Sequence, residues 1–178
     1  MKWNKIIFFL SFIAVSFYGT TQPATTSPSA GEDTAFVNRL LQQSKDLFTS
    51  DPGKAIALSM QAKTVAEKIN FPKGAAIALK NIGLVNKKQG KYLEGLDYYH
   101  QSLKIYEAIK DNQGMANLYS NIGVIYYDRG DDTKALENYL QSLKFAEKAG
   151  DKFRILIALN NIGGIYYDKK ATYDKALQ

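Results

Sequence analysis

A tripeptide that returns at a fixed interval limits what this chain can fold into more than any other feature. Asn-Ile-Gly stands three times, 40 residues apart, at 81–83, 121–123 and 161–163. Two longer matches keep the same register, Gln-Ser-Leu-Lys at 101–104 and 141–144, and Tyr-Tyr-Asp at 126–128 and 166–168. An interval of about 20 to 50 residues is typical of stacked copies of one supersecondary unit. The chain is therefore predicted to be a repeat array.

Each unit has the pattern of two helices. In the first helix, Leu79, Ile82, Gly83 and Asn86 follow one face at the spacing i, i+3, i+4, i+7. The same stripe returns in the next two units, where it predicts Tyr126 and Tyr166 in the core. A glycine inside a helix costs about 1 kcal/mol relative to alanine. Its recurrence predicts a partner helix too close for a side chain, whose facing small residues are Ala55, Gly95 and Ala135.

These patterns predict an all-α chain without strands. We expect helices near 34–49, 53–69, 73–89, 92–109, 113–129, 132–149 and 152–168. An eighth helix is expected to begin near 172, after a turn at Lys169–Thr172. The units fall near 33–74, 75–114, 115–154 and 155–178, and the last is incomplete.

The N-terminus has the layout of a secretory signal peptide. A short basic start at Met1–Lys5 precedes the apolar run Ile6–Tyr18, and small and polar residues follow. That run is shorter than the about 20 residues that a spanning helix needs. We interpret residues 1–20 as an export signal and 21–32 as a disordered spacer. An uncleaved membrane anchor and a buried core helix are the alternatives, and the export signal predicts a periplasmic or extracytoplasmic location.

The order of residues across each helix–turn–helix resembles the tetratricopeptide repeat: apolar, Ile-Gly, Tyr, then Ala, Tyr and Ser. The resemblance covers about 54–178, with Asp33–Ser50 as a degenerate first helix. It implies a right-handed α-solenoid with about three complete repeats and a truncated one. The usual unit has about 34 residues, whereas this one has 40 and lacks the proline that commonly ends the second helix. The longer form is similar to repeats of kinesin light chains, of bacterial peptide-responsive regulators, and of the extracytoplasmic regions before sensor histidine kinases and nucleotide cyclases in Bacteroidetes-type bacteria.

One asparagine of each unit is expected to lie in the groove that stacked first helices form. At about 100° per residue, Asn81 lies about 150–160° from the mean direction of its core stripe. Asn121 and Asn161 take the same place. Neighbouring first helices lie roughly 10 Å apart, so the three amides would form a ladder of donors and acceptors. The resemblance implies that such asparagines hold the backbone of an extended peptide. The alternative is that they are surface residues kept by repeat ancestry.

The flanking positions of the first helices would then set specificity, basic at one end of the groove and aromatic with acids at the other. The further candidate peptide-binding residues are Lys80, Lys87, Asn117, Tyr127, Asn160 and Tyr167. For the two tyrosines, an ordinary surface position is the alternative.

Other functions find little support in the sequence. The chain has no Cys and a single His, His100, which does not favour a Cys- or His-based metal site or catalytic triad. Nucleotide-binding glycine motifs and a nucleophile elbow are absent. The net charge of +6 is modest and spread out, which does not favour nucleic acid. We therefore expect no catalysis, no metal and no cofactor within these residues.

The sequence favours an exported scaffold that binds a protein or an extended peptide in its groove. The first alternative is the N-terminal sensory region of a membrane-bound histidine kinase or nucleotide cyclase, truncated at Gln178. Membrane contact would then come only through an uncleaved signal or a missing C-terminal region. The second alternative is an assembly scaffold that self-associates through an uncapped end.

Overall fold

The computed structural model describes residues 30–176, so residues 1–29 and 177–178 lie outside it. The predicted export signal and most of the predicted spacer fall outside the described residues. Within them the chain forms seven α-helices and no strand, which confirms the all-α prediction. The helices are α1 (Ala30–Asp46), α2 (Pro52–Lys68), α3 (Pro72–Lys88), α4 (Tyr92–Ala108), α5 (Asn112–Asp128), α6 (Asp132–Ala149) and α7 (Lys152–Ala176).

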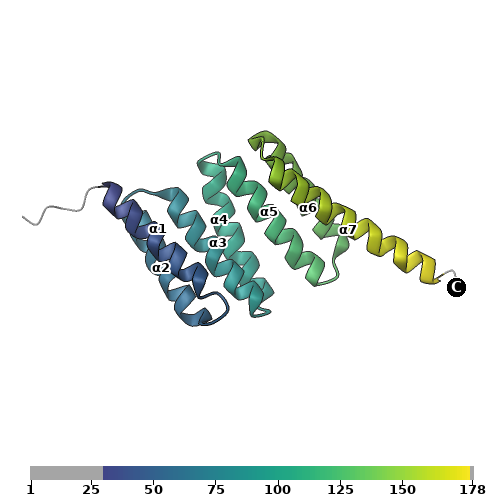
Figure 1. Cartoon of the computed structure of the whole chain (residues 1–178), viewed down its shortest axis with the longest axis horizontal. Helices are drawn as coiled ribbons and strands as arrows, with labels where there is room; N and C mark the ends of the chain where they lie inside the picture. Colours follow the sequence, from purple (N-terminus) through teal and green to yellow (C-terminus); the bar gives the residue numbers. More distant parts are fainter. Residues whose placement is uncertain (1–29, 177–178) are drawn as a thin grey trace, which may run out of the picture.

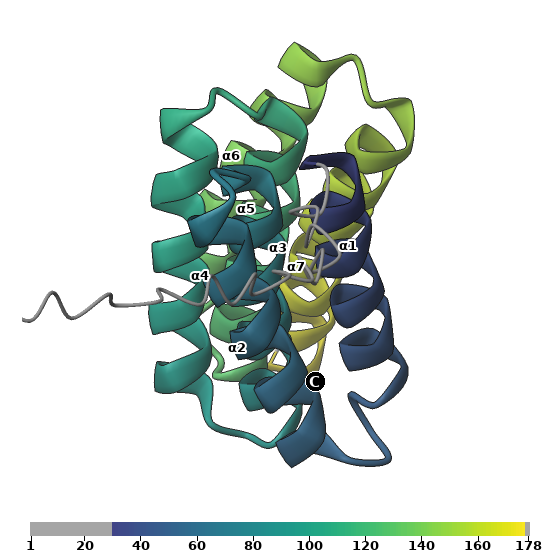
Figure 2. The same ribbon diagram turned by 90° about the vertical axis from the view of Figure 1, so that its left-hand side faces the viewer.

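The helices stack in chain order, from α1 and α2 at one end to α7 at the other (Figure 1). Each helix packs against the next, and the first helices also meet, α1 against α3 and α5 against α7. Figure 2 looks along the stack from the α1–α2 end, with α2 and α4 on one side and α1 and α7 on the other. The fold is therefore a helical solenoid in which α1, α3, α5 and α7 are the first helices of successive units.

The recurring glycines hold the two helices of a unit together, as the sequence predicts. A Cβ on Gly83 would lie 2.5 Å from the ring of Tyr99, and one on Gly123 would lie 2.6 Å from the ring of Tyr139. The backbone of Gly95 is also close to α3, because a Cβ on Gly95 would lie 3.2 Å from the Gly83 carbonyl oxygen. The glycines thus make room for a buried tyrosine of the partner helix.

Buried serines on the second helices tie the same pairs together. The Ser102 hydroxyl donates to the Ala76 carbonyl at 2.7 Å, and Ser142 donates to the Ala116 carbonyl at 2.8 Å. A buried donor left unpaired would cost about 1–3 kcal/mol, so each hydroxyl favours one register of the two helices. The predicted repeat register is therefore visible as repeated hydrogen bonds.

The helix α7 differs from the prediction, because it continues to Ala176 without a turn at Lys169–Thr172. The expected eighth helix is therefore part of α7. The equivalent helices α3 and α5 end just before Gly90 and Gly130, which have φ angles of 74° and 75°. Residue 170, 40 positions after Gly130, is a lysine. A lysine adopts that left-handed conformation less readily than glycine does, which favours a continued helix.

One face of α7 is uncovered. Tyr166, predicted in the core, is 57% exposed, whereas its counterpart Tyr126 packs against the core. A Cβ on Gly163 would meet nothing within 4 Å. The prediction for Tyr166 is wrong because no described second helix packs on this face.

No helix in the described part of the chain is long and apolar enough to span a bilayer.

Candidate functional site: the first-helix groove

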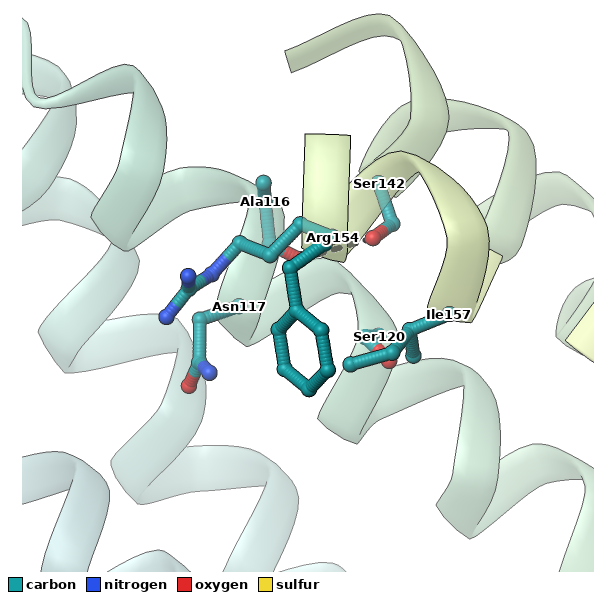
Figure 3. Close-up of a pocket in the computed structure, with 7 residues that line it drawn as sticks. Ala116, Asn117, Ser120, Ser142, Arg154 and Ile157 are labelled. Carbon is teal, nitrogen blue, oxygen red and sulfur yellow. Dashed lines mark hydrogen bonds between the residues drawn. The ribbon is translucent and has the colours of Figure 1, made fainter. Parts of the chain in front are cut away.

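Three hollows lie along the first helices and share lining residues. The hollow between α1 and α3, with a volume of about 360 Å³, shares Ile77 and Lys80 with the next. That middle hollow, of about 160 Å³, shares Asn117 and Arg154 with a third of about 90 Å³ between α5 and α7 (Figure 3). We call the three together the first-helix groove.

The residues that line the groove come from one stripe of each first helix. On α3 these are Lys73, Ile77, Lys80, Asn81 and Leu84, spaced by three and four residues. The 40-residue repeat brings Asn117 and Ser120 of α5, and Ile157 of α7, to equivalent places. These side chains share one side of each first helix, beside the face that carries the glycines, and they line the groove.

Capping aspartates fix the first helices relative to one another. Asp111 accepts a hydrogen bond from the Gly114 N–H at 2.8 Å and caps α5. Lys73 on α3 forms an ion pair with the same carboxylate at 2.8 Å. One unit later, Gln113 donates to Asp151 at 2.8 Å, and Asp151 accepts from the Arg154 N–H at the start of α7. These contacts therefore link α3 to α5 and α5 to α7 along the groove.

Electrostatics lower the pKa of both aspartates. The hydrogen bonds from Gln113 and from Arg154 lower the pKa of Asp151 to about 2. Although partial burial raises it, the bonds from Lys73 and the Gly114 N–H hold the pKa of Asp111 below its usual value. Both carboxylates are thus charged at neutral pH and compensate nearby cations.

Two of the three asparagines of the predicted ladder reach the preceding first helix. Asn81 reaches back to the Leu41 carbonyl of α1 at 3.5 Å, and Asn161 reaches back to the Ser120 hydroxyl of α5 at 3.4 Å. Asn121 donates to Asn117 of its own helix at 3.1 Å. Asn121 and Asn161 are half-buried, and each makes one such bond of the several that an amide offers.

The expected orientation of Asn81 is corrected by its burial. Only 5% of this residue is exposed, although it borders the hollow between α1 and α3. An angle measured within one helix places a side chain opposite its own core stripe. It leaves out the neighbouring first helix, which here covers Asn81. A role in ligand binding stays a prediction for all three asparagines.

The other candidates divide into two groups. Lys80 and Asn117 line the groove. Lys87 instead forms an ion pair with Asp128 at 3.5 Å, which joins the ends of α3 and α5. Asn160 is exposed, and so are Tyr127 at 41% and Tyr167 at 75%; none of the three lines any of the hollows described above.

Arg154 is the groove residue that the sequence did not single out. It stands 40 residues after Gly114 and 80 after Gly74, at a place where the preceding first helices have glycine. Its Nη1 donates to Asp151 at 2.6 Å, while its Nε is buried without a hydrogen-bond partner. Lys80 has a lowered pKa because of burial, and then because of the charges of Lys45 and Arg154. The signal in the sequence that could have identified Arg154 is a charged residue at a repeat position that has glycine in the preceding units.

The groove presents polar and apolar side chains without a cluster of metal-ligand type in the described residues. Across residues 30–176, no three His, Asp or Glu side chains gather as a metal ion would require. The groove offers amides, hydroxyls, apolar side chains and cations on rigid helices, which are the groups that recognise a polypeptide.

Comparison with protein families gives one match. The family model described as tetratricopeptide repeat matches residues 74–148 and again 114–178. No curated protein matches the chain.

Three solved structures have a similar fold. The tetratricopeptide repeat domain of Arabidopsis FLU has a TM-score of 0.58 at 24% identity, over 65% of this chain and 98% of that one. BtubC (BKLC) from P. vanneervenii has a TM-score of 0.64 at 17% identity, over 76% of this chain and 57% of that one. Aspartyl phosphate phosphatase F from Bacillus subtilis has a TM-score of 0.59 at 21% identity, over 82% of this chain and 40% of that one. At these identities the likeness concerns the fold alone.

Proposed function

Because the chain belongs to the tetratricopeptide repeat family, we propose that it is a non-catalytic binding module that holds an extended segment of a partner protein in the first-helix groove. Such repeats generally mediate protein–protein interaction and are typically non-catalytic. The observation that carries the finer proposal is the continuity of the groove. Its three hollows extend from α1 to α7, and each shares lining residues with the next.

The chemistry of the groove also supports an extended ligand. Asn117 and Ser120 of α5 line the groove and offer an amide and a hydroxyl. Ile77, Leu84 and Ile157 add apolar surface to its lining. A polypeptide in extended conformation exposes its backbone amides at regular intervals, so amides and apolar side chains in alternation fit it.

A blocking substitution tests the proposal. Peptides of random sequence would first be selected on the purified protein, and their affinity then measured by fluorescence anisotropy. Asn117→Trp places a large ring where two of the hollows meet and is expected to weaken binding at least tenfold. The matched control is Leu140→Trp, an exposed position on α6 outside the groove, which should bind as the wild type does. Equal affinity of both variants would show that the peptide binds elsewhere.

We propose in addition that the protein is exported, on the strength of residues 1–20 alone. A fusion of residues 1–32 to a reporter that is active only outside the cytoplasm would test this. Activity that is lost when Ile6–Tyr18 is deleted is the expected result. Full activity of that deletion would contradict it. The sensory-region alternative shares this location and would require a catalytic domain encoded downstream.

The exposed face of α7 favours self-association as a second candidate function. Its apolar side chains Phe153, Leu156 and Leu159 are 69%, 65% and 50% exposed. Sedimentation velocity over a range of concentrations is expected to show a dimer that Leu156→Lys abolishes. A monomer at all concentrations would remove this candidate.

A further inference from the structure

The outer side of α7 is the surface that the other first helices use to hold their second helices. On α3 and α5 this side is covered, so Ala76 and Ala116 are fully buried. Leu156, 40 residues after Ala116, is 65% exposed. Within the described residues α7 packs mainly against α6, and its other side faces outward at the end of the stack (Figure 1). A helix-binding surface is therefore open there.

The covered units show which contact this surface makes. The helices α3 and α4 are joined by a short turn and run antiparallel. The ring of Tyr99 lies over Gly83, and Gly95, four residues before Tyr99, lies against the Gly83 carbonyl. The pair α5–α6 repeats the contact with Tyr139 over Gly123. The covering helix thus supplies a small residue and, four residues later, a tyrosine.

The helix α7 carries both halves of this contact on one side. Gly163 has the place of Gly83, and Tyr167, four residues later, is 75% exposed. Residues four apart lie on the same side of a helix. When two α7 helices are placed antiparallel with their Gly163 residues together, Tyr167 of each copy falls on Gly163 of the other. That is the relation of Tyr99 to Gly83, and one register makes it twice.

The residues around Gly163 also suit a pair of identical helices. In a two-fold interface the same patch of both copies meets, so a charge near the axis would face its own copy and repel it. Residues 155–167 contain no Asp, Glu, Lys, Arg or His. The equivalent residues of α3, 75–87, include Lys80 and Lys87, and Lys87 stands where α7 has Tyr167. The sequence of α7 is therefore the one that allows this pairing.

We infer that two copies of the protein pair through α7 about a two-fold axis, with the two helices antiparallel and Tyr167 of each copy over Gly163 of the other. The inference rests on the second candidate function, self-association, and gives it a face, an orientation and a register. At about 100° per residue, Arg154 and Ile157 lie at least about 120° around α7 from Gly163. The first-helix groove therefore stays open in the pair.

Sedimentation velocity over a range of concentrations tests the contact between glycine and tyrosine. Gly163→Ala places a methyl group under the Tyr167 ring of the other copy, and it is expected to weaken the dimer about tenfold or more, as overpacking does. Alanine is the better helix former, so this loss would not come from unfolding of the monomer. Tyr167→Ala should weaken the dimer as well, whereas Tyr167→Phe keeps the ring and should keep the dimer. The matched control is Gly53→Ala, at an exposed place on α2, which should dimerise as the wild type does.

Distances between spin labels test the orientation of the pair. The chain has no Cys, so a single introduced cysteine carries the only label of each copy. Lys152→Cys and Lys169→Cys place the label on either side of Gly163 in α7. In an antiparallel pair centred on Gly163, the two labels lie about 33 Å apart along the helices at position 152 and about 18 Å apart at position 169, at a rise of 1.5 Å per residue. A parallel pair would give equal separations at both positions.

Equal separations, or a dimer that Gly163→Ala and Tyr167→Ala leave unchanged, would overturn the inference, although self-association itself would stand. A monomer at every concentration would overturn both, and the outer side of α7 would then be open to a helix of another protein. The fold of each variant would be checked by circular dichroism before these measurements.

Discussion

At the scale of single residues, the contact between a glycine and a tyrosine recurs at the same place in two units and holds each helix pair at a short distance. The ring of Tyr99 is fully buried above Gly83, so it cannot swing away when a methyl group is added. The same addition at Gly163 meets open space, although both glycines lie in helices at equivalent places. The two positions therefore separate packing from helix propensity.

Gly83→Ala is expected to lower the free energy of unfolding by roughly 1–3 kcal/mol, the usual cost of overpacking a core. Gly163→Ala should raise it by about 0.5–1 kcal/mol, because alanine is the better helix former. Urea unfolding with a shared m-value measures both. Equal effects of the two substitutions would show that the Tyr99 contact does not limit the approach of α3 and α4.

Buried tyrosines make the protein sensitive to alkaline pH. Burial raises the pKa of Tyr106 and of Tyr139 from 10.0 to about 12. The folded state thus holds its phenolic protons more tightly than the unfolded chain does. This stabilisation is complete below pH 10 and is lost as the pH rises towards 12. The urea midpoint should fall over that interval, and fall less in the double variant Tyr106→Phe and Tyr139→Phe. An identical fall in both proteins would assign the loss to other groups, such as Tyr99, whose pKa burial also raises.

At the scale of helices, the capping aspartates do two tasks at once. The Asp111 carboxylate contacts both Lys73 on α3 and the Gly114 N–H of α5. It therefore caps the start of α5 and also fixes α5 against α3. Asp151 repeats the arrangement with Gln113 and α7. The middle hollow of the groove lies between these two links, and its shape depends on them.

Substitutions at Asp111 separate the two tasks. Asp111→Ala removes the cap and the ion pair, and we expect a loss of about 1–2 kcal/mol. Asp111→Asn keeps a good cap and removes the charge, so it should lose only a few tenths.

The two Asp111 variants also differ from the wild type in acid. The folded pKa of Asp111 lies below its ordinary value of 3.8, so its stabilisation is present above that value and is lost as the pH falls through the folded pKa. Stability of Asp111→Asn should change less with pH below about 4, as measured by thermal unfolding. A loss in Asp111→Asn as large as in Asp111→Ala would show that the charge, and not the cap, stabilises α5.

At the scale of the whole molecule, the repeat pattern predicted most of the fold, because 40-residue spacing and the glycine stripe report contacts inside one unit. The close approach at Gly83 and the two-helix units follow from that pattern. The burial of Asn81 and the position of Arg154 do not, because both depend on how neighbouring first helices stack. The length of α7 was missed because residue 170 is a lysine, whereas the equivalent helices α3 and α5 are followed by Gly90 and Gly130.

The groove is likewise a property of the stack, and its site residues could be predicted only in part. Asn117 and Lys80 lie at first-helix positions that line the groove. Tyr127 and Tyr167 lie on the same helices but outside the three hollows. A helical angle distinguishes core from surface, whereas the arrangement of three helices decides which part of the surface is concave.

The most direct test of the account is to map a selected peptide onto the protein by backbone and side-chain NMR shifts. We predict that the largest changes fall on the first helices, at Ile77, Lys80, Asn117, Arg154 and Ile157. Outward positions such as Leu93 on α4 and Leu140 on α6 should stay unchanged. Changes concentrated on α2, α4 and α6, with the first helices unaffected, would contradict the central claim that the first-helix groove is the binding surface.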